Sequence, residues 1–278
     1  MIGSPWCTVC ENRDVDVWWR DGDRSVFCCQ TCDTRFQHPQ PEVEALEKSY
    51  DESYFRDHYI AHADIRLAYF RDRIQELERR TPHRRVIDIG CGPGYFLQVA
   101  TAGGWKAAGL DVSLAAIKHA QAAGLHAVVS ELSVYRPPFR PSVITMWDVI
   151  AHLRNPKQFV VTAAALLPPG GLFVIKFPYR QRLMYRIARL LSCCFPAAGL
   201  LALNSQPHHF TPTSAAYLLE AAGCQVVKTE AVREIDLPIH ANDAVRLRLA
   251  KLVTSIFVRL GLYQSIVIYG QRLDGPLE

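Results

Sequence analysis

The stretch Arg85-Val86-Ile87-Asp88-Ile89-Gly90-Cys91-Gly92-Pro93-Gly94-Tyr95 decides the fold of this chain. Apolar residues at positions 86, 87 and 89 predict a short buried strand, and three glycines at alternate positions predict a tight turn after it. The run 95–100 then predicts the first turns of a helix. Glycine lets the backbone turn and lets a ligand come close, and a helix N-terminus offers N–H groups to an anion. Strand, glycine turn and helix together predict a nucleotide-binding α/β unit.

The spacing of the glycines indicates which nucleotide. The dinucleotide fingerprint G-x-G-x-x-G would need a glycine at position 95, where this chain has tyrosine. The spacing here is G-x-G-x-G, at Gly90, Gly92 and Gly94, and Asp88 precedes the first glycine by two residues. This pattern resembles the first motif of the class I S-adenosylmethionine (SAM) methyltransferases, D-x-G-x-G-x-G. The resemblance implies that Asp88 and the three glycines contact SAM. A degenerate dinucleotide loop is the alternative at this point.

Length and composition limit the number of domains, the kind of partner and the cellular compartment. A chain of 278 residues with 49% hydrophobic residues is long enough for one α/β domain and an appendage. A formal charge of +4 permits an anionic partner without demanding one. The first ten residues contain no basic start and no apolar run, so we expect a cytoplasmic protein with reduced cysteines. The apolar run 190–203 is shorter than the roughly 20 residues of a membrane span, although a surface-lying helix is an alternative.

Two C-x-x-C pairs lie near the start of the chain, Cys7 with Cys10 and Cys29 with Cys32. Tetrahedral zinc needs four soft ligands, and two such pairs at this separation supply them. Cys28 is adjacent, but only Cys29 keeps the two-residue spacer. The pattern predicts a zinc ribbon over residues 1–40. Because four thiolates leave no open coordination position, the zinc is expected to be structural.

Zinc ribbons often contact nucleic acid, so an RNA-modifying enzyme is a second hypothesis. The charges of the ribbon argue against it. Its acidic residues outnumber its arginines, which leaves no basic footprint for a phosphate backbone: the acids are Glu11, Asp14, Asp16, Asp21, Asp23 and Asp33, and the arginines are Arg13, Arg20, Arg24 and Arg35. We therefore expect a small-molecule substrate rather than nucleic acid.

A second resemblance covers the segment after the ribbon. Phe36 four residues after Cys32, prolines at 39 and 41, and Tyr50-x-x-x-Tyr54-Phe55 resemble the zinc-ribbon members of the small-molecule methyltransferases. In that family the helical segment, here residues 41–82, lies over the SAM pocket. The resemblance implies that Tyr50, Tyr54 and Tyr59 are lid residues, with Tyr54 in contact with SAM. The alternative is that these tyrosines only pack on the domain.

The next two strands supply further candidates for SAM binding. The strand 105–111 ends in Asp111, 21 residues past Gly90. A carboxylate at this position can accept two hydrogen bonds from ribose hydroxyls, as in dinucleotide folds. Val112 follows it directly. The third strand, 125–129, is followed by Glu131 and Leu132, which by their position in the fold would border the adenine.

The fourth strand, 142–148, leads to the catalytic candidates. Ligands in open α/β sheets bind beyond the carboxyl ends of the strands, so Trp147, Asp148 and His152 should face the site, with Trp147 against SAM. The segment 147–156 resembles the family's D-V-x-x-H-x-x-x-P, and His209-Phe210-Thr211 resembles its H-F-T. Imidazole titrates near neutral pH, so His152 and His209 are the predicted catalytic residues. Asp148 is a weaker candidate.

These patterns agree on one architecture. We expect an α/β fold: a Rossmann-like, seven-stranded methyltransferase sheet with helices on both faces and an antiparallel last strand, plus a small N-terminal zinc ribbon. The SAM-binding domain would span residues 83–278, with a cap inserted at about 180–208. Glycine-rich "L-P-P-G-G" at 167–171 is again typical of the family.

The predicted function is SAM-dependent methyl transfer, in secondary metabolism, to a partly apolar or carrier-bound small molecule at oxygen, nitrogen or carbon. Three alternatives stay open: an RNA methyltransferase, an NAD(P) oxidoreductase disfavoured by Tyr95, and a non-catalytic SAM-binding protein. The sequence does not indicate whether the protein is a monomer or an oligomer.

Overall fold

The computed structural model describes residues 5–21, 24–40, 63–180, 183, 206–232, 256, 259–260 and 263–274. Its elements, in chain order, are β1 Val15–Asp21, β2 Arg24–Cys29, β3 Arg35–His38, α3 Ala63–Arg80, β4 Arg85–Ile89, α4 Tyr95–Ala102, β5 Lys106–Asp111, α5 Leu114–Ala122, β6 Ala127–Val129, β7 Val143–Trp147, the 3₁₀ turn η3 Ile150–His152, α6 Pro156–Ala164, β8 Leu172–Arg180, β9 His208–His209, α9 Pro212–Ala221, β10 Cys224–Val232 and β11 Tyr263–Arg272.

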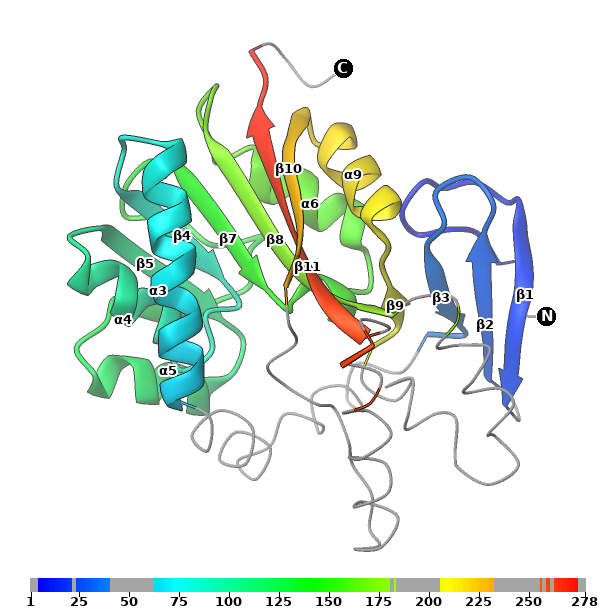
Figure 1. Cartoon of the computed structure of the whole chain (residues 1–278), viewed down its shortest axis with the longest axis horizontal. Coiled ribbons are helices and arrows are strands. Elements are labelled where there is room, and N and C mark those ends of the chain that lie inside the picture. The colour runs from blue at the N-terminus through cyan, green and yellow to red at the C-terminus, as the bar shows by residue number, and fades with distance from the viewer. Residues whose placement is uncertain are drawn as a thin grey trace, which may run out of the picture.

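A seven-stranded sheet forms the centre of the molecule, with strand order β10-β11-β8-β7-β4-β5-β6 (Figure 1). The strands β8, β7, β4, β5 and β6 pair in parallel, and β11 is antiparallel to both of its neighbours. This confirms the expected Rossmann-like sheet and its antiparallel last strand. The carboxyl ends of the parallel strands share one edge, and the glycine loop after β4 lies there.

Helices cover both faces of the sheet, α3, α4 and α5 on one and α6 and α9 on the other (Figure 1). Side chains alternate along each strand, so β7 feeds both cores. Val143 and Trp147 belong to the cluster with α3 and α4, whereas Ile144 and Met146 belong to the cluster with α6 and α9. Burial on both faces explains why these strands are continuous apolar runs.

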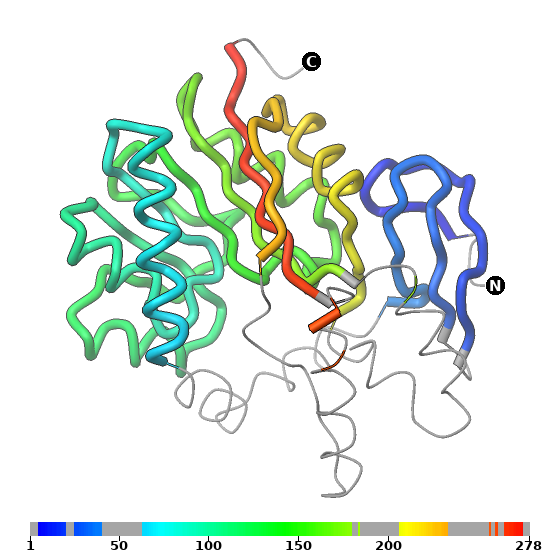
Figure 2. The backbone as a smooth tube through the Cα atoms, viewed as in Figure 1, coloured from blue at the N-terminus to red at the C-terminus, as the bar shows by residue number. Residues whose placement is uncertain are grey.

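A second sheet, of order β1-β2-β3-β9, contains the ribbon. Its fourth strand does not come from the ribbon: β9 precedes α9, and it pairs with β3 through Arg35 with His209 and Phe36 with His208. Phe36 also shares a continuous buried cluster with Phe210. Figure 2 shows the ribbon chain running alongside this segment. The ribbon is therefore built into the α/β domain through both backbone pairing and a shared core.

Charged groups fasten α3 to the strands β10 and β11. Glu76 accepts hydrogen bonds from Arg80 Nε at 2.8 Å and from Lys228 Nζ at 2.7 Å. Lys228 also pairs with Glu230 at 2.8 Å, and the Tyr269 hydroxyl donates to Glu230 at 3.0 Å. Burial alone would raise the pKa of Glu76, but Lys228 and Arg80 outweigh it and lower the pKa to about 2. This network fixes the helix that covers β7.

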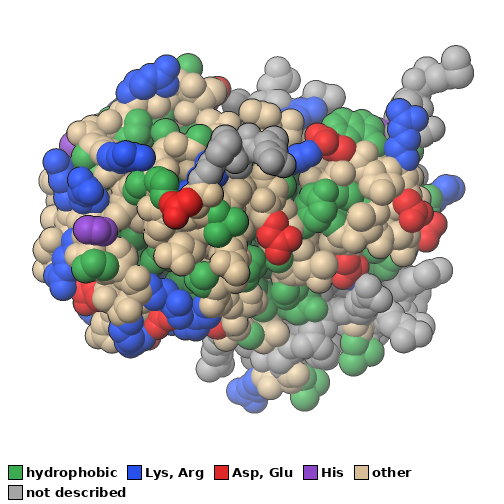
Figure 3. Space-filling view, turned by 90° about the horizontal axis from the view of Figure 1, so that it is seen from above, with side chains coloured by type: hydrophobic (Ala, Val, Ile, Leu, Met, Phe, Trp, Pro, Cys, Tyr) green, Lys and Arg blue, Asp and Glu red, His purple; other side chains and the backbone are tan. Residues whose placement is uncertain are grey.

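Two predicted features lie outside the described residues. They are the lid tyrosines Tyr50, Tyr54 and Tyr59, and most of the cap 180–208. Of the described helices, none combines the length and the apolar character that crossing a membrane would take. In the space-filling view, Lys and Arg side chains gather on the side of the molecule that carries α3, α4 and α5 (Figure 3).

Candidate functional site

The glycine loop after β4 packs against Val149 and against the end of α5, and it leaves no room for a Cβ at Gly90 or Gly94. Gly90, Gly92 and Gly94 have φ values of +71°, +52° and +86°, a region that other residues rarely adopt. A Cβ at Gly90 would lie 2.3 Å from Val149 Cγ2, and one at Gly94 would lie 2.6 Å from Leu125 Cδ1. Both the backbone conformation and the packing therefore require glycine. The loop delivers the chain into α4, whose N-terminal turn is buried at the same edge.

Asp111, at the end of β5, is bound to that loop. Its Oδ2 accepts a hydrogen bond from the Gly92 N–H at 2.9 Å, and its Oδ1 accepts one from the Ser113 N–H at 2.8 Å. A carboxylate has about four acceptor positions, so each oxygen can still accept a further hydrogen bond, such as one from a ribose hydroxyl. Burial raises the pKa of Asp111, while the hydrogen bonds from Ser113 and Gly92 oppose that rise. The arrangement suits a ligand with two neighbouring hydroxyls.

Asp88 lies deeper. Its carboxyl is only 1% exposed and accepts a hydrogen bond from Thr145 Oγ1 at 2.6 Å. Burial, and to a smaller degree the nearby Asp111, raise the pKa of Asp88 well above its usual range. This carboxyl joins β4 to β7 beneath the loop. A direct contact between Asp88 and SAM stays a prediction.

Apolar side chains are exposed next to Asp111. Val112 is 72% exposed, although it directly follows a buried strand. Across from it, at the end of β6, Val129 is 49% exposed, Glu131 is exposed and Leu132 is buried. Apolar surface with a few polar groups is the usual lining of a small-molecule site. These residues could enclose an aromatic base such as adenine.

Trp147 ends β7 within a cluster of aromatic rings. Its ring centroid lies 5.4 Å from that of Phe70, 5.3 Å from that of Phe96 and 6.2 Å from that of Tyr69. The side chain is 9% exposed, and its buried Nε1 has no hydrogen-bond partner among the described residues. A buried donor of this kind is a candidate ligand contact. The ring itself packs under α3, which sequence patterns did not indicate.

One pair of charges at this edge was missed by sequence reasoning. The Asp148 carboxylate forms an ion pair with Nζ of Lys176, a residue of β8 that is 3% exposed. Asp148 has φ of +62°, an uncommon value for a non-glycine residue, and such strained residues cluster at functional sites. Its backbone N–H donates to the Lys176 carbonyl at 3.0 Å. The signal available in the sequence was a lysine within an apolar strand, because lysine is seldom buried without a partner.

The two histidine-bearing segments lie together beyond β7 and β8. His152 ends η3 and is half-buried, while His209 lies on β9 and is 2% exposed. β9 packs against η3, so the fold brings these distant segments to one place. The neighbouring His208 is fully buried, with Nε2 at 2.6 Å from Thr8 Oγ1. His209 is therefore enclosed beside the ribbon, and His152 is the more accessible imidazole.

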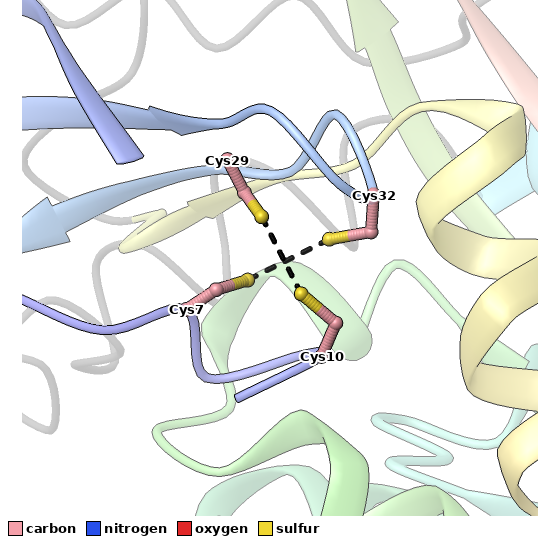
Figure 4. Close-up of side chains that lie close together, drawn as sticks. All are labelled: Cys7, Cys10, Cys29 and Cys32. Atoms are coloured by element: carbon pink, nitrogen blue, oxygen red, sulfur yellow. Dashed lines mark hydrogen bonds between the residues drawn. The ribbon is translucent and has the colours of Figure 1, made fainter. Parts of the chain in front are cut away.

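The four cysteines converge on a point (Figure 4). Their sulfurs all lie within 4.8 Å of one another, with Cys7 and Cys32 separated by 3.6 Å and Cys10 and Cys29 by 3.4 Å. Zinc–sulfur bonds of about 2.3 Å in a tetrahedron would separate the sulfurs by about 3.8 Å, so the cluster fits the ion. The contact between Cys7 and Cys32 lowers the pKa of Cys32 and, together with burial, raises the pKa of Cys7, so a bound cation would be needed to hold all four side chains as thiolates.

Comparison with known proteins decides the family. A family model described as "Methyltransferase domain" matches residues 59–229, more than half of the chain. The chain belongs to this methyltransferase family. It is a SAM-dependent enzyme of class I, as the glycine loop and the sheet order indicate together.

Individual relatives of this methyltransferase share only part of its length. It is 24% identical over 159 residues to a ubiquinone biosynthesis O-methyltransferase of Burkholderia thailandensis, covering 54% of this chain and 68% of the relative. It is 34% identical over 125 residues to the protein of the same name from Maricaulis maris, covering 40% and 48% of the two chains. A solved structure, phosphoethanolamine N-methyltransferase 2 of Haemonchus contortus with SAM, has a TM-score of 0.59 at 13% identity over 86% of this chain and 62% of that one. The last likeness establishes the fold.

Proposed function

We propose that this enzyme methylates a hydroxyl oxygen of a small, partly apolar molecule. The observation that carries the proposal is the group of polar side chains at the end of β7 and on β8: Asp148 pairs with Lys176, His152 follows on η3, and Val149 between them packs against Gly90 of the glycine loop. A hydroxyl nucleophile must lose a proton during transfer, and this edge offers proton acceptors. Relatives named for O-methylation support the choice of oxygen.

In this proposal the chain holds SAM at the β4 and β5 side of the sheet. Asp111 would accept hydrogen bonds from the ribose, Val112 and Leu132 would border the adenine, and the glycine loop would let the methionine part approach the backbone. The sulfonium group of SAM supplies an already activated methyl group, so the protein need only align a nucleophile and accept a proton.

The acceptor would lie on the β7 and β8 side. His152 is the proposed proton acceptor, with His209 as the second candidate, and both are half-buried or buried at the junction of η3 and β9. The Asp148 side chain is 35% exposed, so it can accept a hydrogen bond from the acceptor hydroxyl. Lys176 would keep that carboxylate ionised and in place, because a nearby cation favours the charged form.

We also propose that the cysteine cluster holds one structural zinc ion. Four thiolates close the coordination sphere, so the ion takes no part in methyl transfer. The negative balance of charge around it gives no support to an RNA substrate.

The proposal is tested by incubating the enzyme with methyl-labelled SAM and pairs of probe acceptors. In each pair, a simple catechol or phenol is compared with an aniline of the same shape. Label should enter the hydroxyl probes. His152→Gln is expected to reduce turnover by about 10²–10⁴, the usual range for loss of a general base, while the affinity for S-adenosylhomocysteine changes by only a few-fold. If only the anilines are labelled, the acceptor atom is nitrogen and the proposal of a hydroxyl oxygen is wrong. Normal turnover in His152→Gln, His209→Gln and the double variant would remove both histidines from the mechanism.

A further inference from the structure

His208 connects the cysteine cluster to β9, the strand that packs against the η3 turn after β7. The imidazole is 0% exposed, and its Nε2 lies 2.6 Å from Oγ1 of Thr8, which stands between the ligands Cys7 and Cys10. The strand β9, which carries His208, packs against η3, and Leu153 directly follows η3 and His152. A ring stack of His208 against Phe210, with centroids 5.9 Å apart, holds the plane of the imidazole. One buried side chain thus joins the first metal-binding turn to β9, and β9 in turn packs on η3.

Other contacts between the ribbon and the domain fall on the same region. The Gln37 N–H donates to the Pro207 carbonyl at 2.9 Å, next to β9. Gln40 Nε2 donates to the Arg154 carbonyl at 3.1 Å, and Lys157 at the start of α6 pairs with Glu11 at 2.6 Å. The strand that bears Asp111 lies at the opposite end of the sheet from the ribbon (Figure 1). The ribbon therefore contacts the acceptor side of the proposed site, and SAM would bind at a distance from it.

We propose that the metal-bound ribbon positions the loop 149–154. In this proposal His208 is the positioning residue through which the order of the metal-binding turn reaches the loop. A bound metal fixes the turn 7–10, because such small sites fold only around their ion. When the turn is fixed, the Thr8 hydroxyl meets His208 and so holds β9 in place where it packs against η3. When the metal leaves, Thr8 is no longer held, and a fully buried imidazole loses one of its partners, which is costly. The loop that carries His152 would then open more often, while the glycine loop would not.

The assignment of this region to the methyl acceptor rests on the proposed function, but the coupling between the ribbon and the loop 149–154 does not. For this reason the test reads backbone motion rather than turnover. Amide hydrogen exchange is measured by mass spectrometry on the full, metal-loaded protein, comparing peptides from 147–158 and 206–212 with a peptide from the glycine loop, 86–98. Each amide exchanges at a rate set by the local opening of its own segment. The method therefore distinguishes a loop that opens more often from a protein that is less stable as a whole.

Thr8→Val removes the hydroxyl and keeps the side-chain shape. It should accelerate exchange in 147–158 and 206–212 by about five- to tenfold, the effect of about one hydrogen bond, with exchange in 86–98 unchanged. Thr8→Ser, which restores the hydroxyl, should return the rates to those of wild type. Thr31→Val is the matched control, because Thr31 occupies the second C-x-x-C turn but is exposed. It should change neither region.

Removal of the metal with a chelator should produce the same acceleration in 147–158, together with loss of protection in the ribbon. Affinity for S-adenosylhomocysteine, measured by calorimetry, should stay within about threefold. If Thr8→Val proves too unstable to measure, His208→Gln serves in its place, since His208 is not a metal ligand. Unchanged exchange in 147–158 after metal removal would overturn the coupling. Equal acceleration in 86–98 would show a global effect and would overturn it as well. Failure to methylate any probe, with the coupling intact, would count against the proposed function alone.

Discussion

The prediction that bears most directly on cofactor binding concerns Asp111. Each of its carboxylate oxygens accepts one backbone hydrogen bond, from Gly92 at 2.9 Å and from Ser113 at 2.8 Å. One acceptor position per oxygen is left for the ribose. A hydrogen bond to a charged group contributes about 1.5–3 kcal/mol, so Asp111→Ala should lose about 3–6 kcal/mol of binding free energy. Affinity for S-adenosylhomocysteine should fall by a factor of at least about 100.

Asp111→Asn makes the test sharper. The side-chain amide nitrogen of asparagine cannot accept a hydrogen bond. In the place of one carboxylate oxygen, this nitrogen would face a backbone N–H without bonding to it, and one hydrogen bond from the ribose would be lost. We expect a loss of about 1.5–3 kcal/mol, or about 10- to 150-fold in affinity. The control is Asp72→Asn, which makes the same chemical change at an exposed position of α3 and should not alter binding.

The assay is titration calorimetry with S-adenosylhomocysteine, repeated over a range of pH. Burial raises the pKa of Asp111, so its protonation on acidification should begin at a higher pH than for an ordinary aspartate. Affinity should be full above this folded-state pKa and should fall as pH decreases through it; Asp111→Asn should show no such fall. Affinity of Asp111→Ala within threefold of wild type would refute the reasoning and would mean that the ribose is held elsewhere.

Three further predictions concern the metal, the charge pair and acid stability. Cys10→Ser should lose the bound zinc by elemental analysis while retaining S-adenosylhomocysteine binding within a few-fold; a fully folded wild type without metal would contradict the zinc site. Asp148→Asn should reduce turnover on a hydroxyl probe by about tenfold or more with little change in Tm, because asparagine tolerates the left-handed backbone; equal turnover would leave the ion pair with a structural role only. Lys228 and Arg80 lower the pKa of Glu76 to about 2 from 4.5, so its contribution to stability is present above about pH 4.5 and lost as pH falls toward 2. Urea unfolding at several acidic pH values should show this loss in wild type and not in Glu76→Gln.

Much of the fold could be read from local patterns. The apolar run before Gly90 and the glycines at alternate positions predicted the strand, the turn and the helix, and the structure has β4, the loop and α4 at these places. The spacing of the cysteines likewise predicted a cluster that the structure assembles. Such signals are readable because backbone sterics and short-range spacing act within a few residues.

The contacts that give this enzyme its particular shape were not readable in this way. The strand β9 has two residues, too few for any periodic pattern, and its pairing with β3 joins segments far apart in the sequence. The pairing of Lys176 with Asp148 depends on β7 and β8 lying side by side.

The sequence by itself therefore indicated the main strands and helices of the domain, the glycine loop after β4 and the cluster of four cysteines. Only the tertiary structure decided that the ribbon shares a sheet with the methyltransferase domain and that Thr8 of the ribbon contacts the buried His208 of β9. The physical reason is that a local conformation depends on neighbouring residues, whereas a contact between distant segments depends on how buried surfaces and unpaired backbone groups find partners across the whole fold.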